Sequence, residues 1–123
     1  MTIAYFCIII AMLIPLFCAG YAKISTKGYD NRSPREFLAK VEGAAKRANY
    51  AQMNSFEAFA PFAAGVIVAH ELHAAQHTID TLAIIFIAAR ILYVFLYIKD
   101  QHLLRSAVWF VGLFATIALF FIR

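Results

Sequence analysis

The chain has 123 residues, enough for one domain and too few for two. Hydrophobic residues make up 63% of it and charged residues 15%, whereas soluble domains average about 45–50% and about 25%. This balance excludes an ordinary soluble protein and predicts a single all-α integral membrane domain over residues 1–123. The net charge of +4 does not indicate nucleic-acid binding, because the basic residues lie between apolar segments and not on a soluble module.

Four apolar segments follow one another along the chain. A helix that crosses about 30 Å of hydrocarbon needs roughly 20 mostly apolar residues. Strands are excluded, since an open sheet cannot lie in lipid and the segments are too few for a barrel. We therefore predict a bundle of four transmembrane helices, at about residues 3–21, 44–69, 79–98 and 103–122.

The first segment has the length and hydrophobicity of a signal peptide. It lacks the basic start that such a peptide needs, so we expect a retained transmembrane helix. Its two cysteines, Cys7 and Cys18, are separated by about three helical turns, or roughly 16 Å. They share a face of the helix but are too far apart to form a disulfide with each other.

The loops differ in charge. The second loop, around residues 70–80, has no Lys or Arg, and the third has Lys99 and Arg105. By the positive-inside rule, the first and third loops lie in the cytoplasm and both chain ends lie outside, with only Arg123 opposing this orientation. An alternative role for the basic first loop is to bind anionic lipid headgroups. The basic residues of the first loop are Lys23, Lys27, Arg32, Arg35, Lys40, Lys46 and Arg47.

A short helix is expected inside the first loop. Ser33 is placed to cap it, with Pro34 at its first helical position and Glu36 three residues after the cap.

The second segment carries polar residues on one face. At about 100° per residue, Arg47, Tyr50, Asn54 and Glu57 lie close together on the helical wheel, and Pro61 follows one turn later, where it should kink the helix. Ionisable side chains at membrane depth are costly and usually have a function. This face therefore predicts an internal polar site.

The third and fourth segments carry matching polar residues. Arg90, Tyr93 and Tyr97 share one side of the third helix, and Arg105 and Ser106 open the fourth, followed by Trp109. These faces predict a polar cavity that opens toward the basic loops. Trp109 is also placed to act as a membrane-interface anchor.

The matching depth of Glu57 and Arg90 suggests an ion pair, within one subunit or between two. Whether such a pair would serve function or only hold the bundle together stays open at this point.

Three histidines lie at the second loop. His70, His73 and His77, with Glu71, miss the H-E-x-x-H zinc motif by one residue. They could share a face only if the helix continued through them. We expect exposed imidazoles at a helix end and no metal site.

The segment "KRANYAQMNSFEAFAPF" resembles the signature of the MAPEG family, the membrane-associated proteins in eicosanoid and glutathione metabolism. Arg47, Ala51, Asn54 and Glu57 fall on the signature, and the pair Pro61–Phe62 also fits it. The resemblance continues at Arg90 and Tyr97 in "ARILYVFLY". It ends at Arg105 and Ser106 in "LLRSAVWF", so it covers nearly the whole chain.

The resemblance implies a homotrimer of four-helix subunits, of the short bacterial type, in the inner membrane. It implies a glutathione-dependent transferase or peroxidase acting on lipophilic electrophiles that arrive from the bilayer. Glutathione, the co-substrate, would lie between subunits near the cytoplasmic side, its thiolate stabilised by Arg105 and Ser106. The residues expected to hold glutathione are Lys23, Arg47, Tyr50, Asn54, Glu57, Arg90, Tyr93 and Tyr97.

The chain departs from the family pattern at several positions. Well-studied members have arginines where this chain has Tyr50 and Met53, and often an acidic residue where it has Lys46. Tyr93 replaces a His common in some members, and Trp109 replaces a Tyr. Two other readings therefore stay open: a non-catalytic membrane subunit that keeps the family scaffold, and a small multidrug-type transporter. Such transporters carry their membrane Glu in the first helix, which is uncharged here.

Overall fold

The fold is entirely helical, as predicted. The computed structural model describes residues 1–123 and contains no strand. The four predicted segments correspond to four long helices, with bounds that differ from the prediction by at most three residues, and the short loop helix is also present. The five helices are α1 (Ile3–Ile24), α2 (Pro34–Lys40), α3 (Gly43–Glu71), α4 (Gln76–Ile98) and α5 (His102–Phe121).

Three of the long helices are suited to cross a membrane. By length and composition, α1, α4 and α5 qualify as candidate spans. At 29 residues α3 is long enough. It is less apolar because Lys46 and Arg47 lie near its start, and Asn54 and Glu57 lie further along. The chain is thus a multi-pass membrane protein, and a crossing by α3 stays a prediction.

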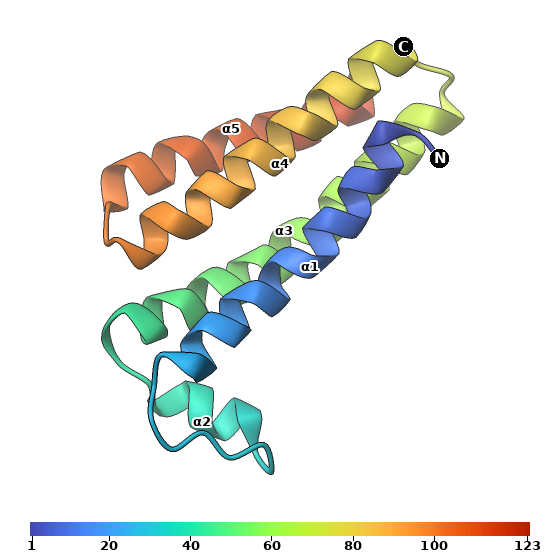
Figure 1. Cartoon of the computed structure of the whole chain (residues 1–123). Helices are drawn as coiled ribbons and strands as arrows, with labels where there is room; N and C mark the ends of the chain where they lie inside the picture. The colour runs from blue at the N-terminus through green and yellow to red at the C-terminus, as the bar shows by residue number, and fades with distance from the viewer.

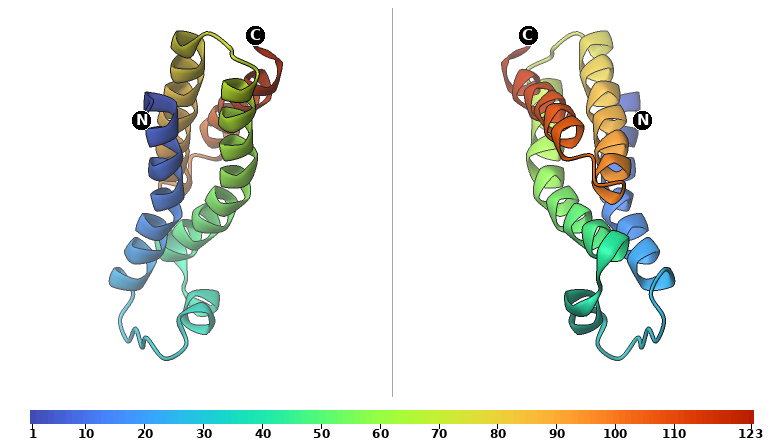
Figure 2. Two further views of the ribbon diagram at one scale, coloured as in Figure 1. Left: turned by 90° about the vertical axis from the view of Figure 1, so that its right-hand side faces the viewer. Right: turned by 90° about the vertical axis from the view of Figure 1, so that its left-hand side faces the viewer.

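The long helices run alternately up and down (Figure 1). α1 packs most closely on α3, and α4 packs most closely on α5. Figure 2 shows that both chain ends and the α3–α4 connection lie at one end, which we call the terminal end. The opposite end, which we call the basic end, holds the first loop with α2 and the α4–α5 turn (Figure 1). The first and third loops therefore lie at the same end, as the charge pattern predicted.

Small and aromatic side chains form the core between the helices. Phe62 of α3 and Phe86 of α4 stack face to face with their ring centroids 3.9 Å apart. Around them many of the buried residues are alanines, among them Ala4, Ala51 and Ala83. Small residues let helix backbones approach closely in a membrane, where packing rather than the hydrophobic effect drives association.

The first loop closes on a smaller apolar cluster at the basic end. Leu38 of α2 and Val41 pack against alanines of α1 and α3. Pro34 occupies the first helical position of α2, as predicted. The predicted cap is wrong in detail: the Ser33 hydroxyl bonds the Glu36 carboxylate at 3.0 Å and makes no capping bond to a backbone N–H.

Polar contacts tie down the start of α1 at the terminal end. Thr2 caps the helix by accepting from the Tyr5 N–H at 3.1 Å, and Asp80 of α4 accepts from the Ala4 N–H at 3.0 Å. The Thr2 hydroxyl also lies 3.3 Å from Nε2 of His70, whose ring stacks on Tyr5. A carboxylate at a helix N-terminus is favourable because the first N–H groups have no partner within the helix.

Two glycines offer a matched test of how closely the helices pack. A Cβ on Gly65 of α3 would lie 3.1 Å from the Leu119 Cβ and 3.3 Å from the Thr116 carbonyl oxygen of α5, whereas a Cβ on Gly112 would have no neighbour nearer than 3.7 Å. We expect Gly65→Ala to destabilise the protein by about 1–3 kcal/mol through overpacking. Gly112→Ala should be neutral or mildly stabilising, because Ala favours a helix over Gly by roughly 0.5–1 kcal/mol. Unfolding of both variants in a denaturing detergent measures the difference, and equal effects would contradict the close α3–α5 contact.

Candidate functional site

A buried arginine lies at the centre of the polar residues. Arg90 of α4 is 3% exposed. Its Nη2 donates to Oδ1 of Asn54 at 2.8 Å and to Oγ of Ser55 at 3.4 Å, both on α3. Its guanidinium also lies over the Tyr93 ring, 4.2 Å from the centroid. An amide, a hydroxyl and an aromatic face thus surround this cation.

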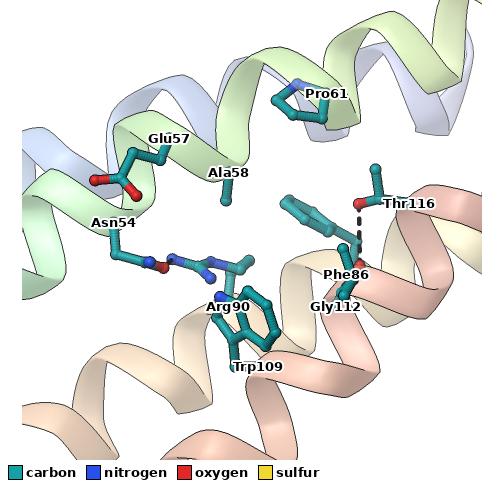
Figure 3. Close-up of a pocket in the computed structure, with 10 residues that line it drawn as sticks. Asn54, Glu57, Ala58, Pro61, Phe86, Arg90, Trp109, Gly112 and Thr116 are labelled. Atoms are coloured by element: carbon teal, nitrogen blue, oxygen red, sulfur yellow. Dashed lines mark hydrogen bonds between the residues drawn. The ribbon is translucent and has the colours of Figure 1, made fainter.

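The predicted ion pair between Glu57 and Arg90 is not formed within the chain. The only ion pair joins Arg32 to Asp30 in the first loop, and Arg90 bonds Asn54 in place of Glu57. Figure 3 shows Glu57 one turn along α3 from Asn54, on the rim of the pocket. Glu57 is exposed, so its carboxylate is open to solvent, while Asn54 accepts the hydrogen bond from the guanidinium.

Aromatic rings connect Arg90 to Arg105. The Tyr93 and Tyr97 rings meet edge to face at 5.6 Å, and the Arg105 guanidinium lies 4.2 Å from the Tyr97 centroid. Arg105 is only partly exposed. Stacking on tyrosine restricts its long side chain, so the cation is held over α4 and not free to sweep the surface.

Two adjoining hollows open on this part of the bundle. One, of about 150 Å³, lies between α3, α4 and α5 and is lined by Asn54, Glu57 and Arg90 among others (Figure 3). The second, of about 360 Å³, has six lining residues. Trp109 lines both hollows, so they adjoin, and we refer to the two together as the cleft. The residues of the second hollow are Tyr93, Tyr97, Arg105, Ser106, Trp109 and Phe110.

Seven of the predicted site residues line this cleft, and two more lie near it. Arg47 makes a structural contact: its Nε donates to the Ile98 carbonyl at 3.0 Å and joins the start of α3 to the end of α4. Tyr50 is 42% exposed, with its ring 6.5 Å from that of Tyr97. The seven that line the cleft are Asn54, Glu57, Arg90, Tyr93, Tyr97, Arg105 and Ser106.

Lys23 lies apart from the others. It sits in the last turn of α1, and its ammonium lies 5.1 Å from the Tyr29 ring centroid. It lines neither hollow of the cleft. Within one chain, Lys23 therefore does not reach the residues with which it was grouped.

The three histidines do not meet. α3 ends at Glu71 and α4 begins at Gln76, so His70, His73 and His77 lie on separate elements. The prediction that His70 is exposed is wrong. Its Nδ1 lies 2.8 Å from the Val66 carbonyl oxygen, and its ring packs on Tyr5. His73 has a φ of 55° and forms the turn.

Sequence reasoning missed Ser55 and undervalued Trp109. Ser55 is 4% exposed and supplies a second acceptor to Arg90. Its signal was a small polar residue beside Asn54 on the inward side of the helix. Trp109 was placed on the face predicted to line the cavity but was not counted among the site residues, yet it lines both hollows.

The contacts of Arg90 lead to a prediction about stability. Asn54→Ala removes the nearer acceptor of a buried cation and should cost about 1.5–3 kcal/mol, the range for a hydrogen bond to a charged group. Glu57→Gln should cause no comparable loss, because Glu57 does not contact Arg90. Unfolding of the purified variants in a denaturing detergent measures both changes. A larger loss for Glu57→Gln than for Asn54→Ala would mean that the ion pair exists after all.

Comparison with known proteins supports the assignment suggested by these residues. The sequence model described as "MAPEG family" matches residues 1–122. No curated protein and no solved structure matches the chain. The match covers all five helices and every residue of the cleft. The chain belongs to the MAPEG family.

Proposed function

We propose that the protein is a glutathione-dependent membrane transferase or peroxidase that acts on lipophilic electrophiles. One observation carries the proposal: Arg105, stacked on Tyr97, stands beside Ser106 at the wall of an open cleft of about 360 Å³. Family membership makes glutathione or eicosanoid metabolism the relevant chemistry. A fixed cation and a hydroxyl donor beside a bound thiol favour its thiolate form, which is the nucleophile.

The cleft residues suit an anionic peptide. Glutathione supplies the nucleophilic sulfur. Arg105 lowers the cost of the negative charge on that sulfur, and the Ser106 hydroxyl, exposed on α5, donates a hydrogen bond to it. Arg90 has five N–H donors but bonds only Asn54 and Ser55 through one nitrogen. Its remaining donors suit a peptide carboxylate, and the exposed Glu57 carboxylate suits an ammonium group.

The same site would admit a substrate from the lipid. Trp109 and Phe110 give one wall of the cleft an apolar surface. A lipophilic electrophile that lies against these rings would be held near Arg105 and Ser106. Holding both reactants in the same cleft converts a bimolecular encounter into an effectively unimolecular step.

A homotrimer of four-span subunits accounts for the exposed polar residues. Glu57 and Tyr50 are exposed on α3, which would place them at lipid if α3 crossed the membrane alone. A neighbouring subunit packed on this face would cover them. In this arrangement α3 crosses the bacterial inner membrane as the fourth span, the basic end faces the cytoplasm and both chain ends lie outside.

A second candidate is a non-catalytic subunit that keeps the scaffold. Tyr50 and Met53 are 42% and 53% exposed on the face of α3 where relatives of known activity carry arginines. Without those two cations the site binds an anionic peptide less tightly, by roughly 1.5–3 kcal/mol for each charged hydrogen bond lost.

Calorimetric titration of glutathione into the detergent-solubilised protein separates the two candidates. If the protein is the proposed transferase, glutathione should bind saturably. Arg105→Ala should weaken this binding about tenfold to a hundredfold, because it removes one charge-assisted hydrogen bond. Arg35→Ala, which removes a charge from the exposed face of α2, is the matched control and should bind normally. Ser106→Ala should then slow conjugation of an aryl halide more than it weakens binding.

The outcomes are distinct. Absence of heat at millimolar glutathione, with protein shown to be folded by its thermal transition, excludes the transferase and leaves the scaffold reading. Equal weakening by Arg105→Ala and Arg35→Ala would show that glutathione binds through diffuse charge and not in the cleft.

A further inference from the structure

A second hollow lies on another side of the bundle, between α1 and α4. It has a volume of about 490 Å³, and all ten residues that line it are hydrophobic. It shares no residue with the cleft of Arg90 and Arg105. We call it the α1–α4 groove, and the proposed thiol chemistry gives it no role.

The groove has the depth of one lipid leaflet. Along α1 it extends from Ile10, near the middle of the helix, to Tyr21, near its end. Eleven residues of helix span about 16 Å, half of the roughly 30 Å hydrocarbon core. Along α4 it extends from Ile91 to Ile98, the last residue of that helix. The groove therefore runs from mid-membrane to the basic end only.

The charge at the mouth of the groove is positive. Lys23 follows Tyr21 by two residues, and the exposed Lys99 follows Ile98 directly. The basic end as a whole has nine Lys and Arg against four carboxylates, and Asp100 is the carboxylate nearest to Lys99 in sequence. One of those four carboxylates, Asp30, is already paired with Arg32. The terminal end has only Arg123 against Glu71 and Asp80.

We propose that the α1–α4 groove is a binding site for an anionic phospholipid of the leaflet at the basic end. One acyl chain lies in the groove from Tyr21 toward Ile10. Lys23 and Lys99 hold the phosphate at its mouth, since lysine stems lie along apolar surface while their ammonium groups reach the headgroup level. Basic residues next to membrane-spanning helices favour anionic lipid in this way.

Titration of phosphatidylglycerol or phosphatidylcholine into the detergent-purified protein tests the site. Native mass spectrometry counts the retained lipids, and the thermal transition reports their effect on stability. Phosphatidylglycerol should be retained and should stabilise the protein more than phosphatidylcholine does. Free glycerol phosphate, which has the charge but no acyl chain, should do neither.

Two matched pairs of variants locate the lipid. Lys23→Gln with Lys99→Gln should weaken phosphatidylglycerol binding about 30-fold, whereas Arg35→Gln with Lys40→Gln removes two charges from exposed positions on α2 and should leave it unchanged. Ile91→Trp should fill the groove and displace the lipid, whereas Leu92→Trp should not. These two residues are 43% and 49% exposed on the same helix, and only Ile91 lines the groove.

Three results would overturn the proposal. One is equal retention of the two lipids, and another is equal loss for Ile91→Trp and Leu92→Trp in protein that still gives a thermal transition. The third is a change of oligomer mass in Ile91→Trp without any retained lipid, which would mean that a second copy of the chain covers the groove. The result does not depend on glutathione binding, so the two proposals can fail separately.

Discussion

The rest of the polar site depends on one constraint, the burial of the Arg90 guanidinium among apolar helices. A cation in such surroundings must be surrounded by acceptors, or the fold loses several kcal/mol. The chain meets this need with Asn54 and Ser55 from α3 and the π-face of Tyr93 from its own helix. These contacts fix the rotation of α3 against α4, and with it the direction in which Glu57 points.

The position of Arg105 follows from the same arrangement. Tyr93 contacts both Arg90 and Tyr97, and the Arg105 guanidinium lies over the ring of Tyr97. Two guanidinium groups are thus kept apart by two rings, so neither raises the cost of the other by direct contact. The buried cation stabilises the bundle, while the outer one remains open to the cleft. Sequence neighbours on α4 therefore join a structural site to the proposed catalytic one.

The helices could be predicted from the sequence because their signals are local. Runs of about 20 apolar residues, charged loops and a proline at the start of α2 each act over a few residues. The polar faces that carry Asn54, Arg90 and Arg105 could be predicted for the same reason, since helical periodicity fixes which side of its own helix each residue occupies. The partner of Arg90 could not. Asn54 and Glu57 lie one turn apart, and the choice between them depends on the relative shift of α3 and α4, which no local pattern encodes.

The same limit explains the errors at the loops. Ser33 satisfied the sequence rule for a cap, but its hydroxyl had a carboxylate at Glu36 within reach and bonded that group. His70 was expected at the surface because it sits near a helix end, yet the start of α1 folds over it and supplies Thr2 and Tyr5 as neighbours. Both outcomes depend on what lies nearby in space.

The polar contacts at the start of α1 lead us to expect a difference in rigidity between the two ends of the molecule. The Asp80 and Thr2 contacts, the close approach at Gly65 and the α3–α4 turn all lie toward the terminal end. The larger hollow of the cleft and the mouth of the α1–α4 groove lie toward the basic end. At the basic end, the bond from Arg47 to the Ile98 carbonyl is the only hydrogen bond between two long helices. Backbone amides near residues 94–106 should therefore exchange with solvent deuterium sooner than those near residues 62–69. Ligands would then enter where the helices separate at the basic end, while the helices stay packed at the terminal end.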